Sequence, residues 1–190
     1  MDMLGFYFDA TRCTGCRTCQ IACKDKNRLE VGTLYREVKT YSVGTYPNAK
    51  VFHFSGSCNH CENPACVAAC ASGAMYKTND GAVLCDTELC DGCGNCVAAC
   101  PYGAPKMLDS GVAGKCDSCY ALRKVGGNTA CVDACLARAL DFGEMDELKA
   151  KHAGEFVSSV PAWPDGQTQP NILIKTKEQC LSEDFKIMII

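Results

Sequence analysis

The chain has 190 residues, of which 18 are cysteine, and a formal net charge of -3 at pH 7. This near neutrality excludes the basic surface that nucleic-acid binding requires. Cysteine makes up much of the apolar content, so the remaining core-forming side chains are few, and disulfides or metal sites are expected to hold the chain together.

The N-terminal residues and the hydropathy of the chain bear on its compartment. Met1–Gly5 shows no basic stretch followed by an apolar run, so no signal peptide is expected. No run of about 18 apolar residues predicts a membrane-spanning helix. The expected location is cytoplasmic, or membrane-associated or extracytoplasmic if a catalytic partner that carries the signal exports the chain. Without an export signal, so much cysteine favours metal ligation over disulfides.

Short strands and short helices are expected along the chain, which indicates the α+β class. The predicted strands are residues 4–9, 50–54, 74–77, 82–85 and 171–175. Asp80-Gly81 between two of them is a hairpin signal. A motif at 65–70 recurs at 95–100 and 130–135, and its alanine-rich Cys-Val-x-Ala-Cys pieces predict one or two helical turns each. No element is predicted for residues 24–49.

Residues 141–190 carry no cysteine motif. Glu144–His152 predicts a short helix, and the prolines between it and the strand at 171–175 indicate an irregular arm. The last six residues, 185–190, are apolar apart from Lys186. We interpret them as an edge strand packed on the domain, the alternative being a tail that docks on a partner subunit.

Sixteen of the cysteines fall into four groups of four. Groups one to four, in order, are Cys13, Cys16, Cys19 and Cys23; Cys58, Cys61, Cys66 and Cys70; Cys90, Cys93, Cys96 and Cys100; and Cys116, Cys119, Cys131 and Cys135. Groups one and three follow C-x2-C-x2-C-x3-C, and Pro101 closes group three, as in bacterial two-cluster ferredoxins. In that motif three thiolates hold one [4Fe–4S] cluster and the fourth ligates its neighbour.

The other two groups are variants of this motif. Groups two and four have four and eleven residues before the third cysteine, and such insertions suit a surface loop. Gly15, Gly92 and Gly94 lie between cysteines and permit the positive φ angles of a tight wrap, with backbone N–H groups facing an anionic cluster. Zinc sites typically use two C-x2-C pairs with a longer spacer. The spacing therefore favours iron–sulfur clusters over zinc or disulfides.

Several single residues have more than one interpretation. Cys85 and Cys180, outside the groups, are interpreted as buried inert thiols. His60 is expected to support ligands by packing, and His53 to be a structural strand residue, with quinol contact as the alternative. Four cations near the groups either screen cluster charge or are simply solvated: Arg17, Lys24, Lys115 and Arg123. No paired carboxylates, Ser/His/Asp set or phosphate-binding loop indicates catalysis.

Longer motifs carry a resemblance to a known family. They are Arg12–Cys16, Ala22–Asp25, Cys58–Glu62, Ala99–Pro105 and Ala139–Gly143. With them the chain resembles, over nearly its whole length, the four-cluster iron–sulfur subunits of the dimethyl sulfoxide reductase family. Ala71 and Leu136 depart from the proline that often follows the last cysteine of a group.

The resemblance implies two interleaved bacterial ferredoxin-like modules with irregular insertions and a C-terminal docking arm. The outer module is residues 1–50 and 106–143, the inner module is 51–105, and the extension is 144–190. Groups one and four share one cluster pair, and groups two and three share the other. The implied ligand sets are Cys13, Cys16, Cys19 and Cys135; Cys116, Cys119, Cys131 and Cys23; Cys58, Cys61, Cys66 and Cys100; and Cys90, Cys93, Cys96 and Cys70. Cys93 stands where nitrate reductase relatives have Trp, so four [4Fe–4S] clusters are expected.

The resemblance also implies the role and the partners of the chain. It would be a non-catalytic subunit that relays electrons between a molybdopterin catalytic subunit, facing the outer pair, and another redox partner. That partner is a quinol-side membrane subunit, facing the inner pair, where the complex has one. The alternative is a free-standing polyferredoxin that shuttles electrons by collision. The substrate of the complex belongs to the catalytic partner.

Overall fold

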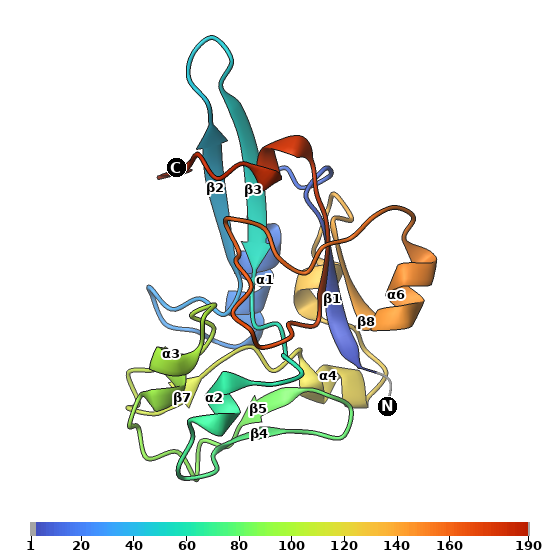
Figure 1. The fold of residues 1–190 in the computed structure, drawn as a ribbon. Helices are drawn as coiled ribbons and strands as arrows, with labels where there is room; N and C mark the ends of the chain where they lie inside the picture. Colours follow the sequence, from blue (N-terminus) through green and yellow to red (C-terminus); the bar gives the residue numbers. More distant parts are fainter. Residues whose placement is uncertain (1–2, 190) are drawn as a thin grey trace.

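The computed structural model describes residues 3–189 as short strands and short helices joined by loops (Figure 1). The strands are β1 (Leu4–Asp9), β2 (Glu37–Val43), β3 (Lys50–Gly56), β4 (Met75–Lys77), β5 (Val83–Cys85), β6 (Lys106–Met107), β7 (Ala113–Gly114), β8 (Leu140–Glu144), β9 (Ile172–Lys175) and β10 (Phe185–Met188). The helices are α1 (Thr18–Lys26), α2 (Ala65–Ala68), α3 (Asn95–Ala99), α4 (Tyr120–Lys124), α5 (Ala130–Asp133) and α6 (Met145–Lys151), with a 3₁₀ turn η1 at Glu178–Leu181. This mixture of small sheets and few helices confirms the α+β class.

A three-stranded sheet of order β8-β1-β9 forms the centre of one half of the molecule (Figure 1). β1 runs antiparallel to β8 and parallel to β9, so it joins segments more than 130 residues apart in the sequence. Phe6 and Phe8 of β1 are buried, and Phe8 meets the Phe54 ring edge-on at 5.1 Å. The strands predicted at 4–9 and 171–175 are confirmed here.

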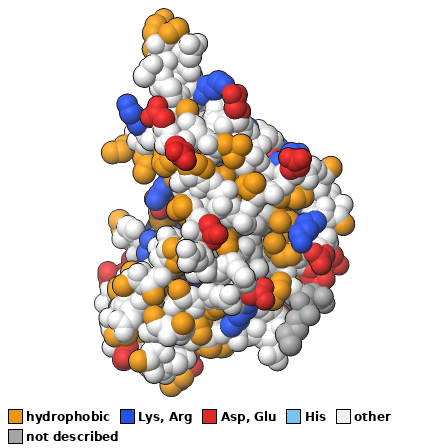
Figure 2. Space-filling view, in the orientation of Figure 1, with side chains coloured by type: hydrophobic (Ala, Val, Ile, Leu, Met, Phe, Trp, Pro, Cys, Tyr) orange, Lys and Arg blue, Asp and Glu red, His pale blue; other side chains and the backbone are white. Residues whose placement is uncertain are grey.

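A second sheet, of order β10-β2-β3, carries the long hairpin at the top of Figure 1. β2 lies in the segment for which the sequence predicted no element. Burial alternates along the first half of this strand, since Val38 and Thr40 are buried while Glu37 and Lys39 are exposed. Apolar side chains cover the hairpin tip (Figure 2), where Tyr46 is almost fully exposed.

The recurring Cys-Val-x-Ala-Cys pieces form α2, α3 and α5, each of four or five residues, as predicted. The hairpin predicted around Asp80-Gly81 is β4 paired with β5. The eleven-residue insertion of group four is only partly a loop, because it contains α4, after which Val125 is exposed.

The C-terminal residues pack along the rest of the chain. α6 follows β8, and β9 completes the central sheet. β10 pairs with β2 at the edge of the second sheet, as the edge-strand interpretation expects, yet Ile187 remains 60% exposed. Ile190 lies outside the described residues. Within residues 3–189, no helix has both the length and the apolar composition to cross a membrane.

Candidate iron–sulfur sites

Three cavities are each lined by four of the grouped cysteines, three from one group and a fourth from a distant one. One cavity is lined by Cys13, Cys16, Cys19 and Cys135; another by Cys58, Cys61, Cys66 and Cys100; and the third by Cys70, Cys90, Cys93 and Cys96, with Cys85 beside them. Because the fourth cysteine comes from another group, each cavity joins two segments that are separate in the sequence. Short helices and left-handed turns bring the three local thiols together.

The remaining four group members, Cys23, Cys116, Cys119 and Cys131, also lie near one another. Burial, and then the negative charge of the Cys131 and Cys119 thiolates, raise the pKa of Cys23 to about 11. Burial raises the pKa of Cys116 well above its usual value, and negative charge on Cys23, Cys58 and Cys131 adds to the rise. α1 and α5 pack against each other and bring Cys23 and Cys131 together.

All eighteen cysteines are free thiols. Within residues 3–189, no group of three or more His, Cys, Asp or Glu side chains is close enough to hold a single metal ion. A single Zn²⁺ would draw its thiolates to about 2.3 Å. The cysteines here surround cavities instead.

Hydrogen-bond donors surround the sulfur atoms. Backbone N–H groups donate to Cys58, Cys70, Cys90, Cys116, Cys119 and Cys135 at 3.2–3.5 Å. The Thr168 hydroxyl donates to Cys61 Sγ at 3.2 Å. A metal-bound thiolate is anionic, and donors around it stabilise that charge and help to set the potential of a cluster. The residues present therefore fit [4Fe–4S] clusters.

The backbone between the cysteines adopts the left-handed turns that the sequence predicted. Gly15, Gly92 and Gly94 have φ of 72°, 73° and 76°. His60 and Cys119 have positive φ as well, which the sequence did not indicate because neither is glycine. At Cys119 the turn begins α4 and aims the thiol inward.

Burial opposes ionisation of most of these thiols. It raises the pKa of Cys13 and Cys61 to about 11 and that of Cys66 to about 12. On the exposed side, a hydrogen bond from Thr18 lowers the pKa of Cys16. A buried thiolate needs positive charge nearby, and the iron of a bound cluster would supply most of it.

The cations singled out from the sequence lie in different surroundings. Lys115 is buried, and its ammonium donates to the carbonyls of Val83 and Cys116. Lys24 donates to the Leu29 carbonyl at 2.9 Å. Arg123 pairs with Asp80 at 3.3 Å, and Arg17 lines the cavity of Cys13. Lys115 alone of the four is a buried charge among the cysteines.

The histidines pack as expected. His60 is buried, and its Nδ1 accepts the Val83 N–H at 2.9 Å. Burial lowers the pKa of His60 well below its usual value, so the ring is neutral. His53 pairs with the Thr40 hydroxyl at 3.0 Å across the β2–β3 hairpin.

The two extra cysteines differ from each other. Cys180 is buried as expected. Cys85 is only partly buried, and its thiol donates to the Ala113 carbonyl at 3.3 Å beside the third cavity. The expectation of a buried Cys85 was therefore wrong, because Cys85 lines that cavity at the end of β5.

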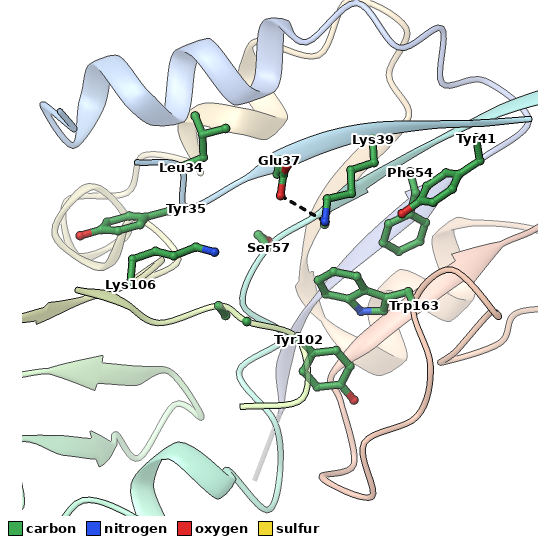
Figure 3. Close-up of a pocket in the computed structure, with 13 residues that line it drawn as sticks. Leu34, Tyr35, Glu37, Lys39, Tyr41, Phe54, Ser57, Tyr102, Lys106 and Trp163 are labelled. Carbon is green, nitrogen blue, oxygen red and sulfur yellow. Dashed lines mark ion pairs between the residues drawn. The ribbon is translucent and has the colours of Figure 1, made fainter. Parts of the chain in front are cut away.

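A further cavity of about 150 Å³ lies between the β2–β3 hairpin and the loop at 102–106 (Figure 3). Aromatic rings wall it, and Tyr102 stacks on Trp163 at 5.1 Å. Glu37 and Lys39 form an ion pair of 3.5 Å across its mouth. No cysteine lines it, so it is separate from the sites above.

The fold and the cysteine sites define a ferredoxin-type iron–sulfur protein. The family model of a 4Fe-4S dicluster domain matches residues 49–145, and that of a 4Fe-4S binding domain matches residues 10–32. The B subunit of anaerobic dimethyl sulfoxide reductase from Haemophilus influenzae is 44% identical over 92% of this chain and 90% of that protein. The corresponding B subunit from Escherichia coli K12 is 44% identical over 90% of this chain and 87% of that protein.

A more distant relative, the thiosulfate reductase electron transfer subunit of Salmonella typhi, is 40% identical over 73% of this chain and 74% of that protein. The chain belongs to the 4Fe–4S family of dimethyl sulfoxide reductase iron–sulfur subunits. It carries [4Fe–4S] clusters and transfers electrons without being the catalytic subunit.

Proposed function

We propose that the chain relays electrons through four [4Fe–4S] clusters between a molybdopterin-containing catalytic subunit and a quinol-side or other redox partner. The relatives are subunits of anaerobic reductases, and they match this chain over most of their length. The observation that carries the proposal is the set of four neighbouring cysteine quartets. The compartment would follow that of the catalytic partner.

The proposed ligand sets use all sixteen grouped cysteines. They are Cys13, Cys16, Cys19 and Cys135; Cys116, Cys119, Cys131 and Cys23; Cys58, Cys61, Cys66 and Cys100; and Cys90, Cys93, Cys96 and Cys70. Three of these sets each line one cavity, which supports one cluster for each. Each cluster, when bound, would supply a one-electron redox centre.

The cysteines also form a continuous row through the molecule. Cys19, Cys131 and Cys135 share one buried cluster of side chains, which joins the first set to the second. Cys58 and Cys116 share another, and Cys66 and Cys96 share a third. Short steps between neighbouring sets are what a relay between two remote redox sites requires.

Several contacts support the proposed modules, although the β2–β3 pairing crosses the boundary between them. In the outer module (1–50 and 106–143), β1 pairs with β8 and α1 packs on α5. In the inner module (51–105), α2 packs on α3. The extension (144–190) contributes β9 to the outer sheet and Thr168 to the inner cavity of Cys61. We propose that the outer pair faces the catalytic subunit and the inner pair the other partner.

Anaerobic purification of the tagged full chain from its native host tests the relay. We expect four irons and four acid-labile sulfides for each of four clusters, together with a stoichiometric large subunit that contains molybdopterin. An intact iron content without any large partner would overturn the subunit role and leave the free shuttle. Zinc in place of iron would overturn both.

A further inference from the structure

Arg36 is a buried cation that the sequence did not bring to notice. It stands directly before β2, and only 2% of its surface is exposed. Its guanidinium lies 4.7 Å from the centre of the Phe6 ring. One amino group donates to the carbonyl and the hydroxyl of Ser55, at 3.0 and 3.1 Å, and the other to the Ser57 hydroxyl at 2.8 Å. Its Nε has no partner among the described residues.

The hydrogen-bond partners of Arg36 are all neutral. Within residues 3–189, no Asp or Glu side chain forms an ion pair with it. A guanidinium does not lose its proton in proteins, and a buried charge without a counter-charge is strongly destabilising. Burial acts against the charge, but the thiolates of Cys131, Cys19, Cys116 and Cys23 outweigh it, so the pKa of Arg36 is raised. The available counter-charge is therefore sulfur.

Arg36 lies close enough to two cysteine sets to interact electrostatically with both. The Ser55 hydroxyl, which it holds, lies 3.4 Å from Cys19 Sγ of the first set. Burial is the largest influence on the pKa of Cys23 and raises it, whereas the charge of Arg36 and its backbone N–H act to lower it. Cys23 belongs to the set of Cys116, Cys119 and Cys131. One residue thus spans the junction between the two outer sets.

We propose that the buried guanidinium of Arg36 is the shared counter-charge of the two outer clusters and raises the reduction potential of both. The inference rests on the proposed ligand sets. Each cluster takes up one electron and no atoms, so reduction adds one negative charge beside a fixed positive one. The attraction between them is strong at low dielectric and favours the reduced form of either cluster. Arg36 thereby sets the potentials at the outer end of the relay.

EPR-monitored redox titration of the anaerobically purified complex tests the proposal. Arg36→Gln removes the charge and retains polar atoms for the two serines. We expect a fall of about tenfold in the reduction equilibrium constant of two clusters, or about 59 mV for a one-electron couple, while the other two stay unchanged. Arg36→Lys keeps the charge, so the midpoints of the same two clusters should lie much closer to the wild type than they do in Arg36→Gln.

Arg28→Gln is the matched control, because it removes the same charge from an exposed residue. It should leave all four midpoints in place. Full iron with unmoved midpoints in Arg36→Gln overturns the inference about Arg36 and leaves the proposed function intact. Low iron in the wild-type complex overturns the proposed function instead.

A second variant decides the question if Arg36→Gln assembles without full iron. Ser55→Ala removes the hydroxyl between the guanidinium and Cys19 and leaves Arg36 in place. A lowered midpoint for a single cluster supports the proposal. Unchanged midpoints in Ser55→Ala overturn it.

Discussion

The hydroxyl of Thr168 shows how one side chain from the extension acts on a distant cysteine. It is buried and donates to Cys61 Sγ at 3.2 Å, and it lies 3.3 Å from the Tyr102 hydroxyl. Thr168→Val preserves the shape and removes this donor. The reduced cluster is more negative and accepts this hydrogen bond more strongly. If the bond differs between the two redox states by about 1 kcal/mol, its loss should lower the midpoint of one inner cluster by roughly 40 mV.

Redox titration checks this expectation, with Thr45→Val as control, since Thr45 lies exposed near the hairpin tip. Equal midpoints in Thr168→Val and the wild type would show that the hydroxyl does not act on a ligand.

Cys85 tests the ligand assignment at the same scale. It lies beside Cys70, Cys90, Cys93 and Cys96, yet its thiol donates to a backbone carbonyl. Cys85→Ala should therefore keep the full iron content, whereas Cys90→Ala should lose cluster iron. Iron and sulfide analysis of the two purified variants separates them, and iron loss in Cys85→Ala would mean that the assignment of the third cavity is mistaken.

At the scale of elements, two C-terminal strands contribute differently to stability. Ile174 of β9 is 1% exposed next to β1, whereas Ile187 of β10 is 60% exposed at a sheet edge. Ile174→Ala should lower the free energy of unfolding by about 2–5 kcal/mol. Ile187→Ala should change it by less than about 0.5 kcal/mol. The temperature at which cluster absorbance is lost on anaerobic heating compares the stability of the two variants with that of the wild type. Similar temperatures for Ile174→Ala and Ile187→Ala would contradict this prediction.

At the scale of the whole molecule, we expect bound clusters to stabilise the two halves unequally, because their apolar cores differ in size. The core around β1 contains aromatic rings such as Phe6, Phe8 and Phe54. The core beside α2 and α3 consists of Met75, Val83, Ala113 and two cysteines. Small cores depend on metal ligation for their stability. The half built on groups two and three therefore has little apolar packing of its own.

Removal of iron with a chelator under reducing conditions should unfold this half first. Proteolysis followed by mass spectrometry should then find early cuts within residues 57–115 and later cuts in β1, β8 and β9. Cuts spread evenly over the chain, or first in β1, would contradict the unequal dependence. The untreated holoprotein is the control.

The sequence by itself determined the cofactor class and most of the local elements. Cysteine spacing within a group is a local constraint, since three thiolates two residues apart wrap one cluster. The aromatic-rich run at 4–9 and the Asp80-Gly81 turn predicted β1 and the β4–β5 hairpin for the same local reason. Glycines between the cysteines gave the left-handed turns. Each of these features depends on contacts within a few residues.

Only the tertiary structure decided the features that depend on distant contacts. β2 forms because β3 and β10 pair with it, while its own sequence shows charge and tyrosine. Arg36 is buried because Phe6, Ser55 and two cysteine sets close around it. Whether a charged side chain is buried depends on which segments pack around it. The same packing determines its hydrogen-bond partners and the local dielectric. Nothing in the residues next to Arg36 carries this information.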